Sequence, residues 1–348
     1  MTTAVRGRTA QDAASARRPV PVRVAWLAAA LVALALVGAA SVAFGVRAVT
    51  WPDVVAGVGG ASNTLAEAAV LQRVPRTVLA MVVGAALGLA GAVMQGVTRN
   101  PLADPGILGV TTGASLAVVV GLAFFGLAAP TTVIWVAILG AAGAAVLVYS
   151  IGSLGRGGAT PLKLALAGAA TSAAFSSLIS AVLLPRVDAL TDFRFWQIGG
   201  VGGASFSRIL QVLPFLAVGA LVCVVTARGL NSLALGDDVA AGLGEHVART
   251  RVLAAAGAIL LAGAATAVAG PIGFVGLAVP HLCRLLVGVD HRWLLPFSTV
   301  VGAVLLTAAD VIGRLVARPA EVDVGIVTAI IGAPIFIWIV RRQKVRAL

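Results

Sequence analysis

Few side chains in this chain could do chemistry, and most of them lie between apolar segments. The acid–base candidates near apolar depth are His281 and Asp310, and Asp104 is a further carboxyl group. The two cysteines, Cys223 and Cys283, lie at the ends of apolar runs and form no pattern typical of a disulfide framework or a metal site. The sequence therefore predicts no catalytic residues and no metal ligands.

The sequence has no phosphate-binding loop. The G-x-x-x-x-G-K-[ST] motif needs a lysine followed by serine or threonine, whereas Lys163 and Lys344, the only lysines, precede Leu164 and Val345. We therefore expect no cofactor on this chain. If ATP drives its activity, the ATPase that uses ATP and magnesium is a separate polypeptide.

The composition is that of a protein dissolved in lipid. The 348 residues are 60% hydrophobic and 11% charged, with a mean hydropathy of +1.05, whereas soluble domains are roughly 45–50% apolar and about 25% charged. Runs such as 253–269 are continuously apolar, which favours helices over the alternating strands of a β-barrel. The prediction is an all-α polytopic membrane protein.

Breaks at charges, prolines and glycine clusters divide the chain into about ten spans of roughly 20 residues each. The predicted spans are 24–46, 77–97, 108–127, 132–151, 162–184, 208–227, 252–270, 273–287, 294–313 and 323–340. The first has about twenty apolar residues, more than the roughly 7–15 of a signal peptide, so we interpret it as an uncleaved span.

The net charge of +12 orients the protein in its membrane. Aromatic residues are only 5% and no basic stripe runs between them, so nucleic acid is not an expected partner. Lys and Arg accumulate in cytoplasmic segments, and they are frequent in the predicted tails 1–23 and 341–348. Both termini are therefore predicted to be cytoplasmic, on either side of a transmembrane domain covering 24–340.

An internal repeat is visible. The segment from Arg76, RTVLAMVVGAALGLAGAVMQ, resembles the segment from Arg249, RTRVLAAAGAILLAGAATAV, and a proline–glycine break follows each of them. The predicted topology runs the copies in opposite directions, as in the inverted repeats of transporters, with halves at about 76–184 and 249–340. Chance similarity between Gly- and Ala-rich segments is the alternative.

The two breaks are candidates for lining a translocation path. Irregular backbone at membrane depth must face protein or water, although a simple cytoplasmic connector would also explain the first break. His281 by itself is more typical of a hydrogen-bonded interfacial residue than of a ligand. The candidate residues are Asn100, Pro101, Asp104, Pro105 and Gly106 in the first break, and Gly270, Pro271, Gly273, Pro280 and His281 in the second.

Three arginines are predicted on the outer side. Arg73 and Arg76 flank Pro75 just before a span, and Arg314 follows Asp310 at the end of another. Arginines at helix ends often extend to the lipid headgroups. The functional alternative is a docking surface for an acidic partner, because Arg pairs with carboxylates in a bidentate manner.

The longest predicted cytoplasmic loop, 227–251, carries Asp237, Asp238 and Glu245 among small and apolar residues. A solvated loop is the simple interpretation. A short helix here would instead gather Leu233, Leu235, Val239 and Leu243 on one apolar face, which suits a segment that docks on a partner.

Other classes of membrane protein fit less well. An ion-coupled secondary carrier would need intramembrane carboxylates as relays, and only Asp310 and Asp104 are near apolar depth. An intramembrane enzyme is not expected, because His281 and Asp310 lie on opposite faces of the membrane in the predicted topology.

Long motifs carry a family resemblance from about residue 49 to residue 342. They include RVPRTVLAMVVGAALGLAGAVMQGVTRNPLADPGILGVTTGAS, RFWQIGGVGGAS, LALGDDVAAGLG, GPIGFVGLAVPHLCRLLVGVDHRWLLP and PAEVDVGIVTAIIGAPIFIWIVRR. The chain resembles the FecCD-type permeases, which include bacterial importers of ferric siderophores, haem and cobalamin. The basic extension before Val24 is somewhat long for that family.

The resemblance implies a ten-span permease in the bacterial cytoplasmic membrane, working with cytoplasmic ATPase subunits. It also implies a second permease subunit, identical or related, with the path at their interface. An extracytoplasmic binding lipoprotein or periplasmic protein would deliver the substrate. Ferric siderophore is the expected substrate, and cobalamin and haem remain open.

The resemblance also implies roles for particular residues. Arg73 and Arg76 match the family's R-x-P-R motif and Arg314 matches the arginine after A-D, which are docking positions for the binding protein. The LALGDD segment matches the family's coupling loop. The implied ATPase contacts are Leu235, Gly236, Asp237, Ala241, Gly242, Leu243 and Gly244.

Overall fold

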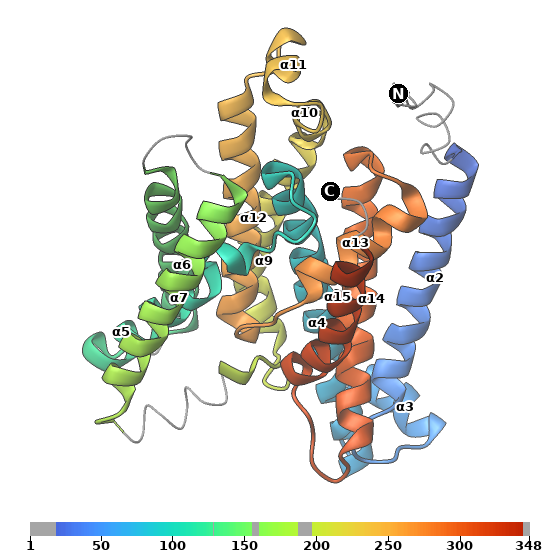
Figure 1. Cartoon of the computed structure of the whole chain (residues 1–348). Helices are drawn as coiled ribbons and strands as arrows, with labels where there is room; N and C mark the ends of the chain where they lie inside the picture. Colours follow the sequence, from blue (N-terminus) through green and yellow to red (C-terminus); the bar gives the residue numbers. More distant parts are fainter. Residues whose placement is uncertain (1–18, 128, 155–159, 187–196, 344–348) are drawn as a thin grey trace.

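A computed structural model describes residues 19–127, 129–154, 160–186 and 197–343. The described part of the chain is helical and contains no strand (Figure 1). Much of the predicted tails, and residues 194–196 of the RFWQIGG motif, lie outside it. The helices are α2 (Val20–Ala43), α3 (Trp51–Val58), α4 (Leu65–Thr98), the 3-10 helix η1 (Pro105–Leu108), α5 (Val110–Phe125), α6 (Pro130–Ser153), α7 (Pro161–Leu183), α9 (Phe206–Val225), α10 (Ala227–Leu233), α11 (Asp237–Gly242), α12 (Val247–Ala269), α13 (Val275–Val287), α14 (His291–Val316) and α15 (Val324–Gln343).

The predicted spans agree with the apolar helices. In the described residues, seven helices are long and apolar enough to cross a membrane, and the apolar parts of α5, α13 and α15 are shorter. Each of these ten helices corresponds to one predicted span. The fold class, an all-α polytopic membrane protein, is confirmed.

The start of α4 differs from the prediction. Thr64 and Glu67 form a capping box, in which the Thr64 hydroxyl accepts from the Glu67 N–H at 3.1 Å and the Glu67 carboxylate accepts from the Thr64 N–H at 3.2 Å. Because these bonds satisfy free N–H groups of the first turn, α4 begins twelve residues before the predicted span. Arg73, Pro75 and Arg76 therefore lie inside the helix and not in a flanking loop.

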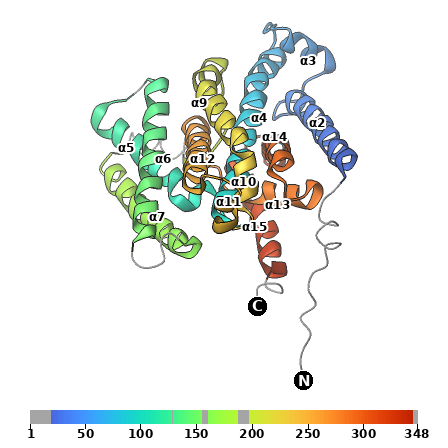
Figure 2. The ribbon, with the colours of Figure 1, turned by 90° about the horizontal axis from the view of Figure 1, so that it is seen from above.

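Helix α4 runs through the centre of the bundle, between α12 and α14 (Figure 2). Glycines allow its backbone to approach its neighbours directly. A Cβ added at Gly84 would lie 2.4 Å from the Gly302 carbonyl oxygen of α14, and one added at Gly91 would lie 1.9 Å from the Gly276 oxygen of α13. Small residues produce this kind of close helix packing within lipid.

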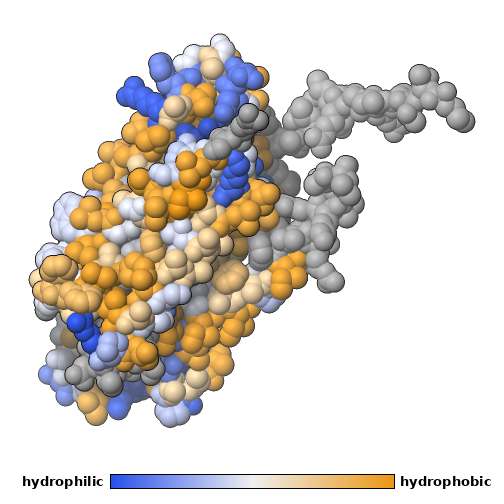
Figure 3. Space-filling model, turned by 60° about the vertical axis from the view of Figure 1, so that its left-hand side comes forward, coloured by the Kyte–Doolittle hydropathy of each residue, from blue (hydrophilic) through white to orange (hydrophobic). Residues whose placement is uncertain are grey.

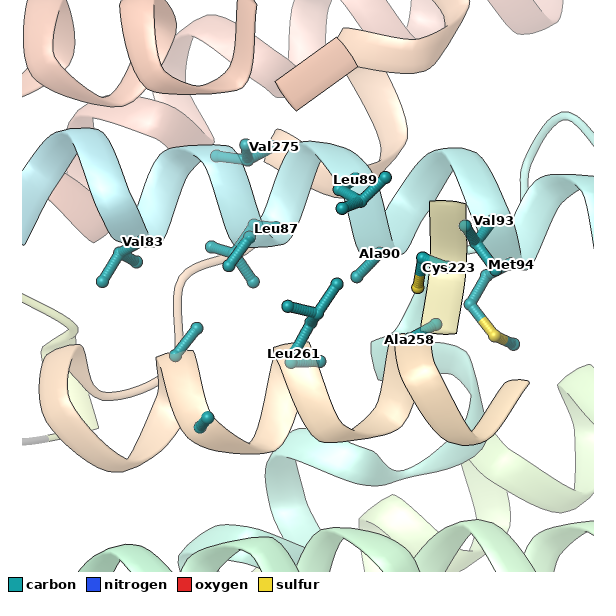
Figure 4. Close-up of a cluster of buried hydrophobic side chains, with 14 of the residues drawn as sticks. Val83, Leu87, Leu89, Ala90, Val93, Met94, Cys223, Ala258, Leu261 and Val275 are labelled. Carbon is teal, nitrogen blue, oxygen red and sulfur yellow. The ribbon is translucent and has the colours of Figure 1, made fainter. Parts of the chain in front are cut away.

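The core is an apolar cluster along α4. Val83, Leu87 and Met94 of α4 are buried with Leu261 of α12 and Cys223 of α9 (Figure 4). The outer surface is also apolar around its middle, with hydrophilic residues towards the two ends (Figure 3). An apolar band between polar ends is the surface expected of a protein that crosses a bilayer.

Candidate functional site

Polar side chains of the first break bond to its own backbone and interrupt the helix. The chain turns after α4 at Arg99, which has a positive φ of 52°. The Asn100 Oδ1 atom then accepts from the Leu102 N–H at 3.0 Å, and the Asp104 Oδ1 atom accepts from the Gly106 N–H at 2.8 Å. These side-chain turns compete with helix formation, and they separate α4 from η1, which begins with the buried Pro105.

Asp104 of the first break lies against the helix that follows the second break, although about 170 residues separate the two segments. A Cβ added at Gly276, in the first turn of α13, would lie 2.5 Å from the Asp104 Oδ2 atom and 3.4 Å from the Gly91 Cα atom. Asp104 forms no ion pair with any described residue. The predicted path residues of the first break thus lie against the start of the helix that follows the second.

The second break covers residues 270–274 and is shorter than predicted. Gly270 and Phe274 bound it with positive φ values of 67° and 68°. Gly273 is exposed, and a Cβ added there would meet nothing within 4 Å. Pro280 and His281 lie farther on, inside the continuous helix α13.

Pro280 still frees a backbone carbonyl, as expected of a proline within a helix. Because Pro280 has no N–H, the carbonyl oxygen of Gly276, four residues earlier, has no helical donor. The Gln95 side chain of α4 supplies one, since its Nε2 atom lies 3.2 Å from that oxygen and 3.3 Å from the Leu277 oxygen. Gln95 is therefore a polar link between α4 and the first turn of α13.

The three predicted docking arginines gather near the N-terminal end of α4, but two of them are buried. The Arg73 guanidinium donates to the carbonyl oxygens of Val42, Ala43 and Arg47 at 3.2, 2.9 and 2.6 Å. Arg314 donates to the carbonyl oxygens of Ser41 and Phe44 at 2.9 and 3.1 Å. Both side chains therefore bind the free carbonyl end of α2.

Asp310 joins two of these arginines. Its Oδ2 atom lies 2.9 Å from Nη2 of Arg314, and its Oδ1 atom lies 2.8 Å from Nη2 of Arg76. Arg76 also pairs with the exposed Glu321 at 2.7 Å. Arg314 is 2% exposed and Arg73 is 6% exposed. Glu321, one partner of Arg76, has a side chain that is 40% exposed. The docking role stays a prediction, and Arg76 is the arginine best placed for it.

The predicted coupling loop forms two short helices, α10 and α11, at the end of the bundle opposite α3 (Figure 1). Gly236 and Gly244, with φ values of 110° and 83°, bound α11 on its two sides. Leu235, Val239 and Leu243 project from it and are exposed, while Leu233 is fully buried. Ala241 and Gly242, the other predicted contacts, are also exposed.

Asp237 connects this exposed segment to the bundle. Its carboxylate forms ion pairs with Arg99, at the turn into the first break, and with Arg251 of α12, the latter at 3.0 Å. The coupling segment and the first break are thus joined by side chains that are partly exposed. The sequence prediction included Asp237 but missed Arg99.

Asn231 ties α10 to the start of α14. Its Nδ2 atom donates to Asp290 at 2.7 Å, and its Oδ1 atom accepts from the His291 N–H at 2.9 Å. Burial of Asp290 opposes its ionisation, but the hydrogen bonds from Asn231 and from the Arg292 N–H outweigh this effect and hold the pKa of Asp290 below its usual value. Asp290 stays ionised beside Arg23, at 3.7 Å.

Sequence reasoning missed several residues of these clusters. Gln95 and Asn231 carried a usable signal, because a polar side chain next to apolar runs needs a hydrogen-bond partner. Glu321 carried none. Among the described residues, no group of three His, Cys, Asp or Glu side chains could hold a metal ion.

Comparisons with known proteins identify the family of the chain. Residues 31–342 match the model of the FecCD transport family. The chain is 46% identical to the iron(3+)-hydroxamate import system permease FhuB of Bacillus subtilis, over 78% of this chain and 71% of the relative. It is also 46% identical to the ferric enterobactin transport system permease FepD of Escherichia coli, over 78% of this chain and 81% of the relative.

A solved structure shares the fold. It is an inward-facing conformation assigned to a metal-chelate type ABC transporter, with a TM-score of 0.78 and 30% identity over 92% of this chain and 99% of the solved chain. The family model covers nearly all of the described helices, from within α2 to the end of α15. The chain therefore belongs to the FecCD transport family.

Proposed function

We propose that this chain is the permease subunit of an ATP-binding-cassette importer that carries a ferric siderophore across the bacterial cytoplasmic membrane. Membership of the family supports the mechanism, and the two named relatives, which carry iron(3+)-hydroxamate and ferric enterobactin, support the substrate class. The chain itself has no phosphate-binding loop, so a separate ATPase supplies the energy. Both termini lie in the cytoplasm.

Three exposed apolar side chains in and beside α11 carry this proposal. Leu235, Val239 and Leu243 are 61%, 51% and 65% exposed, and α11 lies at the polar end of the molecule, beyond the apolar band (Figures 1 and 3). Apolar side chains exposed there are suited to an interface with another protein. In this function the ATPase binds α11.

The ion pairs of Asp237 provide a route from the ATPase to the path. A displacement of α11 would act on Arg99, and Arg99 is the residue at which the backbone turns into the first break. Asp104 of that break lies against the first turn of α13. The segment from α11 to Asp104 is therefore our candidate for the element that changes state with the nucleotide.

At the outer end, the binding protein docks through carboxylates. A carboxylate of the partner takes the place of Glu321 on Arg76, since that half of the Arg76 pairing is exposed. Arg73 and Arg314 act by holding the end of α2 beneath this surface. A second permease subunit, identical or related, completes the path lined by the two breaks.

Uptake of radiolabelled ferric siderophore tests the proposal. We would compare cells lacking this gene with cells complemented by the wild-type chain, under iron limitation, with haem and cobalamin as parallel substrates. Loss of ferric siderophore uptake alone is the expected result. Loss of cobalamin or haem uptake instead would keep the mechanism and replace the substrate.

A variant of the partner ATPase that cannot hydrolyse ATP separates this function from an ion-coupled carrier. Uptake should stop in that strain while the membrane potential is intact. Uptake that continues without ATP hydrolysis, and that collapses with the ion gradient, would overturn the importer mechanism.

A further inference from the structure

A cavity of about 430 Å³ lies where the end of α9 turns into α10 and meets the start of α14. Its walls combine two basic side chains, Arg228 and Arg292, with Val224, Val225 and Pro296. The buried His291 forms part of its lining. The cavity is separate from the helix breaks and from the exposed face of α11.

The two arginines of this cavity form no direct ion pair. Within the described residues, neither the Arg228 nor the Arg292 guanidinium forms an ion pair or a hydrogen bond, and both residues are exposed. The nearby Asp290 attracts Arg292 electrostatically, but it also pairs with Arg23 and accepts from Asn231. The two arginines therefore leave the cavity with a net positive charge.

An apolar surface leads to the cavity along α9. Val224 and Val225 are 53% and 71% exposed at its rim, and Val218 and Leu221, on the preceding turns, are also exposed. Spacings of three, four and seven residues place Val218, Leu221 and Val225 on one face of the helix. A molecule bound here would meet positive charge at one end and an apolar strip at the other.

We propose that this cavity binds the headgroup of an anionic phospholipid, with the acyl chains along the exposed face of α9. Arginine is suited to phosphate because its planar guanidinium donates two parallel hydrogen bonds to the oxygens. The cavity lies at the same end of the bundle as α11, the end assigned above to the cytoplasm. Anionic lipids are characteristic of that leaflet, and basic pockets between transmembrane helices bind their headgroups.

The test measures lipid binding by the purified full-length chain in a neutral detergent, by native mass spectrometry. Phosphatidylglycerol and phosphatidylcholine are titrated onto the wild-type chain and onto the variant Arg228→Ala/Arg292→Ala. Loss of two charges should weaken phosphatidylglycerol binding roughly tenfold or more. Phosphatidylcholine binding should be weak in both chains.

Matched variants separate the cavity from general surface charge. Arg249→Ala removes an exposed basic residue near α11 and should leave binding unchanged. Arg228→Lys/Arg292→Lys keeps the charge but loses the paired donors of the guanidinium, so its affinity should lie between those of the wild-type chain and the double alanine variant. The thermal unfolding midpoint of every variant is measured, so that loss of folding is recognised.

Three outcomes would overturn the proposal. The first is an equal loss of phosphatidylglycerol binding in Arg249→Ala, and the second is no loss in the double variant with the fold intact. The third comes from competition with inorganic phosphate, which distinguishes the source of the phosphate group. Displacement of the lipid by millimolar phosphate would mean that the cavity binds a free anion, which contradicts the lipid assignment.

Discussion

The two ends of α4 are held in opposite ways. Near its N-terminal end, Arg73 and Arg76 form multiple bonds with α2 and α14, and the shared carboxylate of Asp310 is 1% exposed. At its C-terminal end, Arg99 pairs with Asp237 through side chains that are 36% and 47% exposed. Buried networks resist rearrangement because breaking them leaves an unpaired charge, whereas exposed pairs contribute little stability. The comparison indicates a rigid N-terminal end and a C-terminal end whose ion pair is easier to break.

The strongest test of the rigid end is Asp310→Ala. This change leaves the buried Arg314 without a counter-ion and leaves Arg76 with only the exposed Glu321. Breaking a buried pair costs roughly 3–5 kcal/mol. The midpoint of thermal unfolding in detergent should fall steeply, together with the yield of monodisperse protein. Glu321→Ala is the control, because it removes only the exposed partner of Arg76 and should cost about 0–1 kcal/mol. Similar losses in both variants would show that the outer cluster is not a buried unit.

The middle of α4 should be almost as sensitive. Gly91→Ala places a methyl group against the Gly276 carbonyl oxygen, and overpacking of this kind costs about 1–3 kcal/mol. Gly143→Ala is the matched control on α6, since a Cβ there meets nothing within 4 Å. It should stabilise the chain by up to about 1 kcal/mol through helix propensity. Thermal unfolding that moves in the same direction for both variants would contradict the close crossing of α4 and α13.

The hydrogen bond between Gln95 of α4 and the Gly276 carbonyl of α13 should contribute less to the stability of the fold. Gln95→Leu removes the side-chain donor to the Gly276 oxygen, and an unsatisfied buried carbonyl costs roughly 1–3 kcal/mol. Pro280→Ala restores a backbone N–H that can bond the same carbonyl. The double variant Gln95→Leu/Pro280→Ala should therefore lose less stability than the sum of the single changes. Additive losses would mean that the two residues do not share this carbonyl.

At the C-terminal end of α4, loss of the ion pair between Arg99 and Asp237 should cause the smallest change in stability but a large change in transport. Asp237→Ala removes exposed ion pairs, so the unfolding free energy should change by no more than about 1 kcal/mol. Uptake of ferric siderophore should nevertheless fall severalfold, because α11 loses its connection to Arg99. Asp238→Ala is the control, since the neighbouring Asp238 forms no ion pair with any described residue. Equal uptake by both variants would remove Asp237 from the coupling route.

The sequence predicted the helices well and the contacts between them poorly. Ten apolar runs predicted ten apolar helices, because roughly 20 apolar residues are enough to identify a span. The error at the start of α4 arose because Arg73, Pro75 and Arg76 are typical of a loop, while the capping box at Thr64 and Glu67 extends the helix through them. The capping box is a local motif, so the sequence itself contains the signal for this helix start.

The positions of the charges could not be predicted from composition. Arg314 was expected at a docking surface, yet its guanidinium bonds the carbonyl end of a helix 273 residues earlier in the chain. Such a pairing depends on which helices pack together, and local periodicity carries no information about that. The predicted apolar face of the coupling loop was wrong for Leu233, which is buried at the end of α10, whereas Leu235, Val239 and Leu243 are exposed. Gly236, with its positive φ, separates α10 from α11 and divides the predicted single helix.

The bonds at the end of α2 also constrain how the protein is made. Only 11% of the most apolar stretch of α2 is buried against the rest of the molecule, so polar bonds make an important contribution at its end. Arg73 is synthesised about 30 residues after the carbonyls that it binds, but Arg314 follows more than 200 residues later. The full set of bonds at the end of α2 can therefore form only after α14 has been made.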